Sequence, residues 1–235
     1  MPEKERHDAL VQFGLEKNLA KMRRDLEKYR ITYDTWFFES TLHDSGYVEE
    51  TVDLLTQKGA TYESEGALWL RTSDYGCEKD DVLRRANGFY TYFAADIAYH
   101  RNKFEQRGFD RVINIWGADH HGHVARLKAA LDILGLDGSH RLEIVLMQLV
   151  RLMRDGEVVR MSKRTGKAIT LSDLLDEISC DAARYFFNSR AADTHLEFDL
   201  GLAVRRTTKP GVLCPVCHAG QEHSAEPGAR RGAVQ

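Results

Sequence analysis

Apolar residues recur at every third or fourth position through residues 3–29, and charged residues occupy the positions between them. This spacing is typical of an amphipathic helix with one apolar face. The apolar positions are Leu10, Val11, Leu15, Leu19, Met22 and Leu26. We therefore expect a surface helix that packs along one side.

The next part of the chain predicts a small α+β region. Residues 31–39 are rich in β-branched and aromatic side chains and indicate a strand, and residues 48–58 indicate a short helix that ends at a glycine. Residues 60–63 and 67–71 flank Ser64, Glu65 and Gly66, which is a hairpin signal. We assign residues 1–80 to this region.

From Asp81 onward, strand and helix patterns alternate in the manner of a parallel sheet covered by helices. The expected order is a strand at 112–116, a helix at 124–134, a strand at 144–149, a turn at Asp155 and Gly156, and helices at 171–178 and 181–190. Thr170 or Ser172 would cap the first of these two helices. The pattern predicts an α/β domain over residues 81–200.

Residues 201–235 differ from the rest, because glycine, proline, cysteine and arginine occur there without helical or strand periodicity. Few large apolar residues would anchor this tail, so we expect it to be disordered.

Composition narrows the possible function classes. A hydrophobic content of 43% is ordinary for a globular protein. The longest apolar stretch, residues 142–153, contains charged residues, and the amino terminus has no apolar signal region, so we expect a cytoplasmic protein without membrane contact. The net charge of −3 gives no global attraction for nucleic acid, so RNA binding would need local basic clusters such as Lys21, Arg23 and Arg24.

The segment 117–123, Gly-Ala-Asp-His-His-Gly-His, directly follows a predicted strand and precedes a helix. Ligands in open α/β sheets bind at the carboxyl ends of strands, where glycine admits a nucleotide and an acidic side chain takes ribose hydroxyls. Gly117 and Asp119 fit these roles. Three neighbouring histidines also suggest a metal site as an alternative, because histidine is a common metal ligand. No cluster of Cys, Asp or Glu elsewhere completes such a site, so we expect no metal there.

A second candidate is the loop 160–167, Arg-Met-Ser-Lys-Arg-Thr-Gly-Lys, which combines glycine and hydroxyl residues with closely spaced cations. Such a loop is able to fold over a polyphosphate, with Lys163 as a mobile charge. The alternative is an exposed basic turn.

Tyr92 and Asp96 form the third candidate, because residues four apart lie on one helix face. A carboxylate beside an aromatic ring complements a guanidinium group, which binds carboxylate through two N–H groups and stacks on rings. The alternative is a half-buried helix with an ordinary tyrosine and a solvated aspartate.

Taken together, these segments resemble the bacterial arginyl-tRNA synthetases, which are class I enzymes, from about Phe13 to Leu200. The Met161-Ser162-Lys163-Arg164 sequence is similar to the KMSKS signature of that class, with Arg160 in place of its first lysine. The resemblance implies the second half of a Rossmann catalytic domain, preceded by the α+β region.

The resemblance also implies a reaction and a set of site residues. The family activates arginine with ATP, supplied as its Mg²⁺ complex, and transfers it to tRNA. Tyr92, Asp96 and His120 would bind arginine, Gly117, Asp119, His120 and Lys163 would bind ATP, and the loop of Met161, Ser162 and Lys163 would act in catalysis. The oligomeric state is open, and we expect a monomer.

Two departures from the family pattern bear on activity. The family carries a His-Ile-Gly-His type motif early in the Rossmann fold, and this sequence contains none. The family also continues into an anticodon-binding domain where this chain has its tail. We therefore expect an incomplete fragment with doubtful activity, and a non-catalytic arginine- or tRNA-binding remnant is the alternative.

The tail contains Cys214-Pro-Val-Cys217-His218, which matches the Cys-x-x-Cys-His pattern of haem attachment. A zinc site of Cys214, Cys217, His218 and His223 is the other interpretation. We expect neither metal nor haem, because no export signal and no folded surroundings are predicted there.

Overall fold

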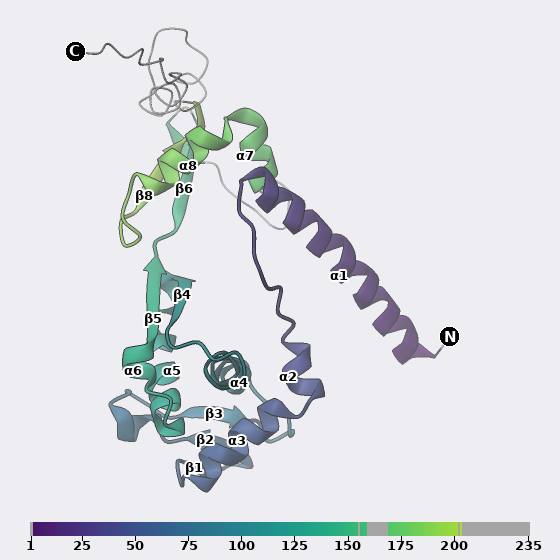
Figure 1. The fold of residues 1–235 in the computed structure, drawn as a ribbon, viewed down its shortest axis with the longest axis vertical. Helices are drawn as coiled ribbons and strands as arrows, with labels where there is room; N and C mark the ends of the chain where they lie inside the picture. Colours follow the sequence, from purple (N-terminus) through teal and green to yellow (C-terminus); the bar gives the residue numbers. More distant parts are fainter. Residues whose placement is uncertain (1, 155, 159–168, 202, 204–235) are drawn as a thin grey trace, which may run out of the picture. The chain divides into compact units, whose positions relative to one another are not determined.

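The computed structural model describes residues 2–154, 156–158, 169–201 and 203 (Figure 1). Contacts divide the described chain into two units, which are treated separately below. The first unit contains residues of 1–34, 150–191 and 195–203, and the second contains residues 35–149 and 192–194. These units do not coincide with the segments 1–80 and 81–200, whose division as domains stays a prediction.

The first unit joins three helices to a small sheet. Its helices are α1 (Glu3–Lys28), α7 (Leu171–Glu177) and α8 (Cys180–Asn188), and its strands β6 (Val150–Arg154), β7 (Glu157–Val158) and β8 (Leu196–Asp199) pair in the order β7-β6-β8. The expected cap of α7 is Thr170, which forms a reciprocal capping box with Asp173. Residues such as Leu174, Phe198 and Leu200 form the core of this unit.

Helix α1 is present where its periodicity predicts it, but its expected packing is not found. None of its residues is buried among the described residues, and Leu10, Phe13 and Met22 are exposed. Near its carboxyl end, Lys28 forms an ion pair with Asp176 at α7. The apolar spacing therefore predicted the helix correctly and its burial incorrectly.

The second unit begins with helices and an antiparallel sheet. Helices α2 (Ser40–Asp44) and α3 (Tyr47–Gln57) precede β1 (Thr61–Ser64), β2 (Ala67–Leu70), the 3-10 turn η1 (Thr72–Tyr75) and β3 (Asp81–Arg84). The hairpin is confirmed, with Glu65 and Gly66 both at positive φ in its turn. β3 pairs antiparallel with β2, so the parallel arrangement begins later than Asp81.

The strand expected at residues 31–39 is wrong, because this segment is irregular and leads into α2. Its aromatic residues are used for packing, and the ring of Phe37 stacks on Tyr99 with centroids 4.6 Å apart. Strand propensity measures how well a side chain suits a half-buried sheet surface, and an irregular segment can bury the same side chains.

The remaining elements form a strand-helix-strand unit. Helix α4 (Tyr92–Glu105) precedes β4 (Val112–Gly117), the 3-10 turn η2 (Ala118–His120), α5 (His121–Leu134), α6 (Gly138–Arg141) and β5 (Leu142–Met147). β4 and β5 pair in parallel from Val112 with Leu142 to Gly117 with Met147, as the alternating pattern predicts. The structure is thus mixed α/β, and none of the helices among the described residues is long and apolar enough to cross a membrane.

Candidate functional site

Helix α4 presents Tyr92 and Asp96 on one face of the second unit. The Thr91 hydroxyl accepts a hydrogen bond from the Ala94 N–H at 3.3 Å, and this cap starts the helix so that Tyr92 is its first residue. Tyr92 is 82% exposed and the Asp96 side chain is 37% exposed. The sequence spacing therefore gave the correct secondary structure, and both groups are accessible to a ligand.

The turn after β4 carries the residues expected to meet a nucleotide. Gly117 ends the strand, and a Cβ atom at this position would lie 2.5 Å from the Asp119 Oδ1 atom. The side chains of Asp119 and His120 are 73% and 60% exposed, with the Asp119 Oδ2 and His120 Nε2 atoms 3.8 Å apart. This turn is open to solvent, and the His120 ring also lies 6.1 Å from the Trp116 ring, centroid to centroid.

Asp96 has a partner that sequence reasoning did not identify. The Nε2 atom of His123, on α5, lies 2.9 Å from the Asp96 Oδ2 atom. On the other side of the imidazole, Arg126 Nε donates to His123 Nδ1 at 2.7 Å, and Arg126 Nη1 donates to Asp81 Oδ1 at 2.5 Å. A chain of polar contacts thus runs from Asp96 through His123 and Arg126 to Asp81.

Aromatic rings enclose the middle of this chain. The His123 ring lies 5.5 Å from the Phe93 ring and 5.3 Å from the Trp116 ring, centroid to centroid. The Arg126 guanidinium lies 5.2 Å from the Phe93 centroid, a cation–π distance. The His123 side chain is only 11% exposed, so its orientation is fixed by packing as well as by hydrogen bonds.

A buried polar network links α4 to β4. The His100 Nδ1 atom bonds to the Asp96 carbonyl oxygen at 2.7 Å, and its Nε2 atom bonds to the Asn114 side chain at 2.7 Å. Burial lowers the pKa of His100 to about 4, so this imidazole is neutral at pH 7. Burial, together with nearby Arg107, also lowers the pKa of Lys103, which donates to Asn114, to about 8.

Several residues named from the sequence lie outside the described residues. These are Met161, Ser162 and Lys163 of the basic loop, and Cys214, Cys217, His218 and His223 of the tail. Among the residues that the structure describes, no group of three or more His, Cys, Asp or Glu side chains is placed to hold a metal ion. The three histidines at 120–123 do not converge into such a group.

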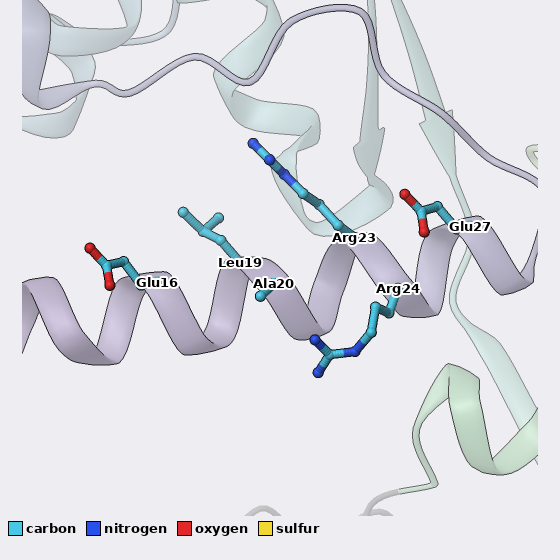
Figure 2. A pocket seen from close by; sticks show the side chains of 6 residues that line it. All are labelled: Glu16, Leu19, Ala20, Arg23, Arg24 and Glu27. Carbon is cyan, nitrogen blue, oxygen red and sulfur yellow. The ribbon is translucent and has the colours of Figure 1, made fainter.

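The hollows on the described surface include one beside α5 and one along α1. One of about 410 Å³ is beside the amino end of α5 and is lined in part by Cys77, Asp81, His121 and Arg126. The other, of about 450 Å³, lies along α1 and is lined by Glu16, Leu19, Ala20, Arg23, Arg24 and Glu27. In Figure 2 the side chains of Arg23 and Arg24 leave α1 in different directions, although both line this hollow.

Comparison with known proteins identifies the family. Residues 15–199 match the family described as tRNA synthetases class I (R), catalytic domain. An arginine–tRNA ligase of Caldanaerobacter subterraneus subsp. tengcongensis is 58% identical over 213 residues, which are 91% of this chain and 38% of that protein. One of Moorella thermoacetica is 60% identical over 198 residues, 84% of this chain and 35% of that protein.

A solved structure agrees with this result. An arginyl-tRNA synthetase from Campylobacter jejuni superposes with a TM-score of 0.75 at 44% identity, covering 82% of this chain and 41% of that one. The chain therefore spans well under half the length of the relatives that it matches. Over that span the agreement of sequence and fold is consistent, and the chain belongs to the class I arginyl-tRNA synthetase family, matching its catalytic domain.

Proposed function

We propose that the second unit contains the arginine-binding part of an arginine–tRNA ligase site, with the side chain of Asp96 as the ligand for the guanidinium group. The observation that carries this proposal is the pairing of Tyr92 and Asp96 on the exposed face of α4, with the Asp96 carboxylate held by His123. A planar guanidinium donates two parallel N–H groups to one carboxylate and lies flat on a ring. His120, on the neighbouring turn, completes the pocket.

The turn after β4 is proposed to bind the adenosine of ATP. The β4-α5-β5 unit has the parallel strand-helix-strand connection of a Rossmann-type fold, whose ligands bind at the carboxyl ends of the strands. Gly117 leaves room beside the chain, and the exposed Asp119 carboxylate suits ribose hydroxyls. Lys163, with Met161 and Ser162, is proposed to act on the triphosphate of the magnesium complex of ATP.

The proposed reaction has two steps. A carboxylate oxygen of arginine attacks the α-phosphorus of ATP, the bond from that phosphorus to the bridging oxygen breaks, and pyrophosphate leaves. A ribose hydroxyl at the end of tRNA then attacks the arginyl carbonyl carbon, loses its proton and displaces AMP. Positioning of the reactants and stabilisation of phosphate charge carry such a reaction, since little covalent chemistry falls to the protein. This activity is proposed for the cytoplasm.

The test is calorimetric titration of arginine and lysine into the full chain and into Asp96→Asn. Arginine affinity is expected to fall by about tenfold to a hundredfold, because hydrogen bonds to a charged partner are lost. Lysine binding, already weak, is expected to change less. Asp53→Asn, which alters an exposed carboxylate on α3, is the matched control and should leave both affinities unchanged.

Equal losses for arginine and lysine, or no loss for arginine, would show that Asp96 is an ordinary solvated residue of the helix. A second candidate function, an arginine- or tRNA-binding protein without turnover, is distinguished by arginine-dependent exchange of pyrophosphate into ATP. Arginine binding without any such exchange favours this second function for the chain.

A further inference from the structure

The partners of His123 determine which of its ring nitrogens carries a proton. A guanidinium group has donors and no acceptor, so the 2.7 Å contact of Arg126 Nε requires a lone pair on His123 Nδ1. The proton of a neutral imidazole is then on Nε2, which faces the Asp96 carboxylate at 2.9 Å. His123 is thus assigned as a neutral donor to Asp96.

The neutral state matters for the charge that Asp96 presents. A doubly protonated His123 would place an N–H against the N–H of Arg126, and it would also cancel the negative charge of Asp96. With Nδ1 occupied by Arg126, the imidazole holds the carboxylate by one hydrogen bond and leaves its full charge available. The remaining charge of Arg126 is balanced by Asp81, at 2.5 Å, on β3.

The hydrogen bond also fixes the carboxylate plane. Rotation about the last side-chain bond of an aspartate has broad minima, so a free carboxylate samples many orientations. His123 engages Oδ2, and an ionised carboxylate offers about four lone-pair positions in all. Enough acceptor capacity remains for two N–H groups of a guanidinium, and the plane in which they must approach is already set.

We propose that His123 and Arg126 are positioning residues of the arginine pocket, with Arg126 keeping Nδ1 of His123 unprotonated and the Nε2 N–H of His123 orienting Asp96. This inference rests on the proposed role of Asp96 as the guanidinium ligand. His123 and Arg126 act through Asp96 and need not touch arginine. Neither residue was identifiable from spacing, since 27 positions separate His123 from Asp96.

The tautomer is read directly from long-range ¹H–¹⁵N correlation spectra of the histidine side chains in the full chain, without ligand. The expected result is a His123 signal with Nε2 protonated and Nδ1 unprotonated. Arg126→Met keeps an apolar side chain against Phe93 and removes the donor that faces Nδ1, so Nδ1 should become protonated in part of the molecules while Nε2 stays protonated toward Asp96. Arg85→Met, at an exposed arginine of the same unit, is the control and should leave the His123 signal unchanged. A protonated Nδ1 in the unmodified chain overturns the inference.

Arginine titrations test the positioning role. His123→Leu fills the ring space and removes the donor, so arginine affinity should fall about tenfold, as for loss of one hydrogen bond to a charged group. His123→Gln supplies an amide donor and should recover most of that loss. A role in packing alone predicts the opposite order, with leucine the better replacement. His43→Leu, at an exposed histidine on α2, controls for loss of an imidazole.

The outcomes separate the two proposals. If Asp96→Asn weakens arginine binding and His123→Leu does not, the pocket stands and the positioning inference is overturned. If Asp96→Asn has no effect on arginine binding, or if the unmodified chain binds no arginine, the proposed function fails and the positioning role fails with it. A loss in His123→Leu with recovery in His123→Gln supports both.

Discussion

Asp96 and Asp119 are both proposed to contact substrate, yet their surroundings are of opposite kinds. Asp96 accepts a hydrogen bond from a largely buried imidazole, which is itself held by Arg126 and two aromatic rings. Asp119 is 73% exposed and approaches His120 only at 3.8 Å. The carboxylate at the proposed amino-acid end of the site is therefore held by protein partners before a ligand arrives, whereas the carboxylate at the proposed nucleotide end is largely exposed.

This difference follows from what each end has to recognise. A guanidinium group requires a carboxylate in one plane, and ordering that carboxylate in advance reduces the entropic cost of binding. In the proposed site a ribose would contact the backbone and the Asp119 carboxylate, whose largely exposed side chain is free to move as the nucleotide binds. Substitutions near α4 are therefore expected to lower stability or arginine affinity clearly, whereas substitutions in the turn after β4 are expected to change them little.

The largest expected effect is the loss of stability in acid. The pKa of His100 is about 4 in the folded protein because the ring is buried, whereas the unfolded chain titrates near its ordinary value of 6.5. The unfolded state therefore binds a proton that the folded state excludes, and stability that is complete above pH 6.5 declines as the pH falls from 6.5 to about 4. The decline should reach about 3 kcal/mol.

Urea unfolding between pH 7 and 4 measures this decline. His100→Gln keeps an amide in the network without a titrating group, so it should unfold more easily at pH 7 and lose most of the slope between pH 6.5 and 4. An equal slope in the variant would mean that other groups, and not His100, set the acid response.

A pair of glycine substitutions has the next largest effect. In Gly138→Ala the new Cβ would lie 2.6 Å from the Leu131 Cβ atom and 2.9 Å from the Lys128 carbonyl oxygen, so packed atoms must shift at a cost of about 1–3 kcal/mol. In Gly117→Ala the close atom is the end of the exposed Asp119 side chain, which is free to swing away, and the cost should stay below about 0.5 kcal/mol. Thermal unfolding of both variants measures the two losses of stability. Equal losses would contradict the expectation that the Asp119 side chain moves aside in Gly117→Ala.

Removing the cap of α4 should cost less than the Gly138 substitution. Thr91→Ala eliminates the hydroxyl that accepts from Ala94 and donates to the Val82 carbonyl oxygen, and loss of a helix cap costs about 1 kcal/mol. Chemical denaturation measures it, with Thr35→Ala, at an exposed threonine outside any helix, as the control. Arginine affinity should fall as well, because the first turn carries Tyr92, and an unchanged affinity would separate the cap from the pocket.

The smallest effect is expected for Asp119→Asn. Its side chain is largely exposed, so the free energy of unfolding should change by less than about 0.5 kcal/mol. Arginine affinity should remain that of the parent chain, because Asp119 belongs to the proposed nucleotide end. A clear loss of arginine binding in this variant would remove the distinction between the two ends.

The sequence predicted elements whose pattern is local. Helix α3, the hairpin of β1 and β2, and the parallel pair of β4 and β5 are confirmed, because apolar period and turn residues such as Gly66 are readable over a few positions. The four-residue strand β8 was not predicted, since its partner β6 ends more than 40 residues earlier in the chain. A strand of that length has too few positions to show alternation.

The candidate site divides in the same way. The shared face of Tyr92 and Asp96 follows from helical spacing and is confirmed as geometry, although the binding roles of these residues stay predictions. The contact of His123 with Asp96 depends on how α4 packs against α5, which no local pattern encodes. The histidines within residues 117–123 suggested a metal site as an alternative. Nothing in the local sequence indicates that one of them contacts a carboxylate on another helix.

The exposure of helix α1 determines how fast its backbone amides are expected to exchange with solvent. An isolated helix is marginal in water, and most helical stability in proteins comes from packing, yet no residue of α1 is buried among the described residues. Its tertiary attachment by Lys28 and Asp176 is at the carboxyl end, and side-chain pairs such as Lys21 with Asp25 add little. Amide protons should therefore exchange with solvent fastest near Glu3 and progressively more slowly toward Lys28, so that one continuous helix records a gradient of local unfolding.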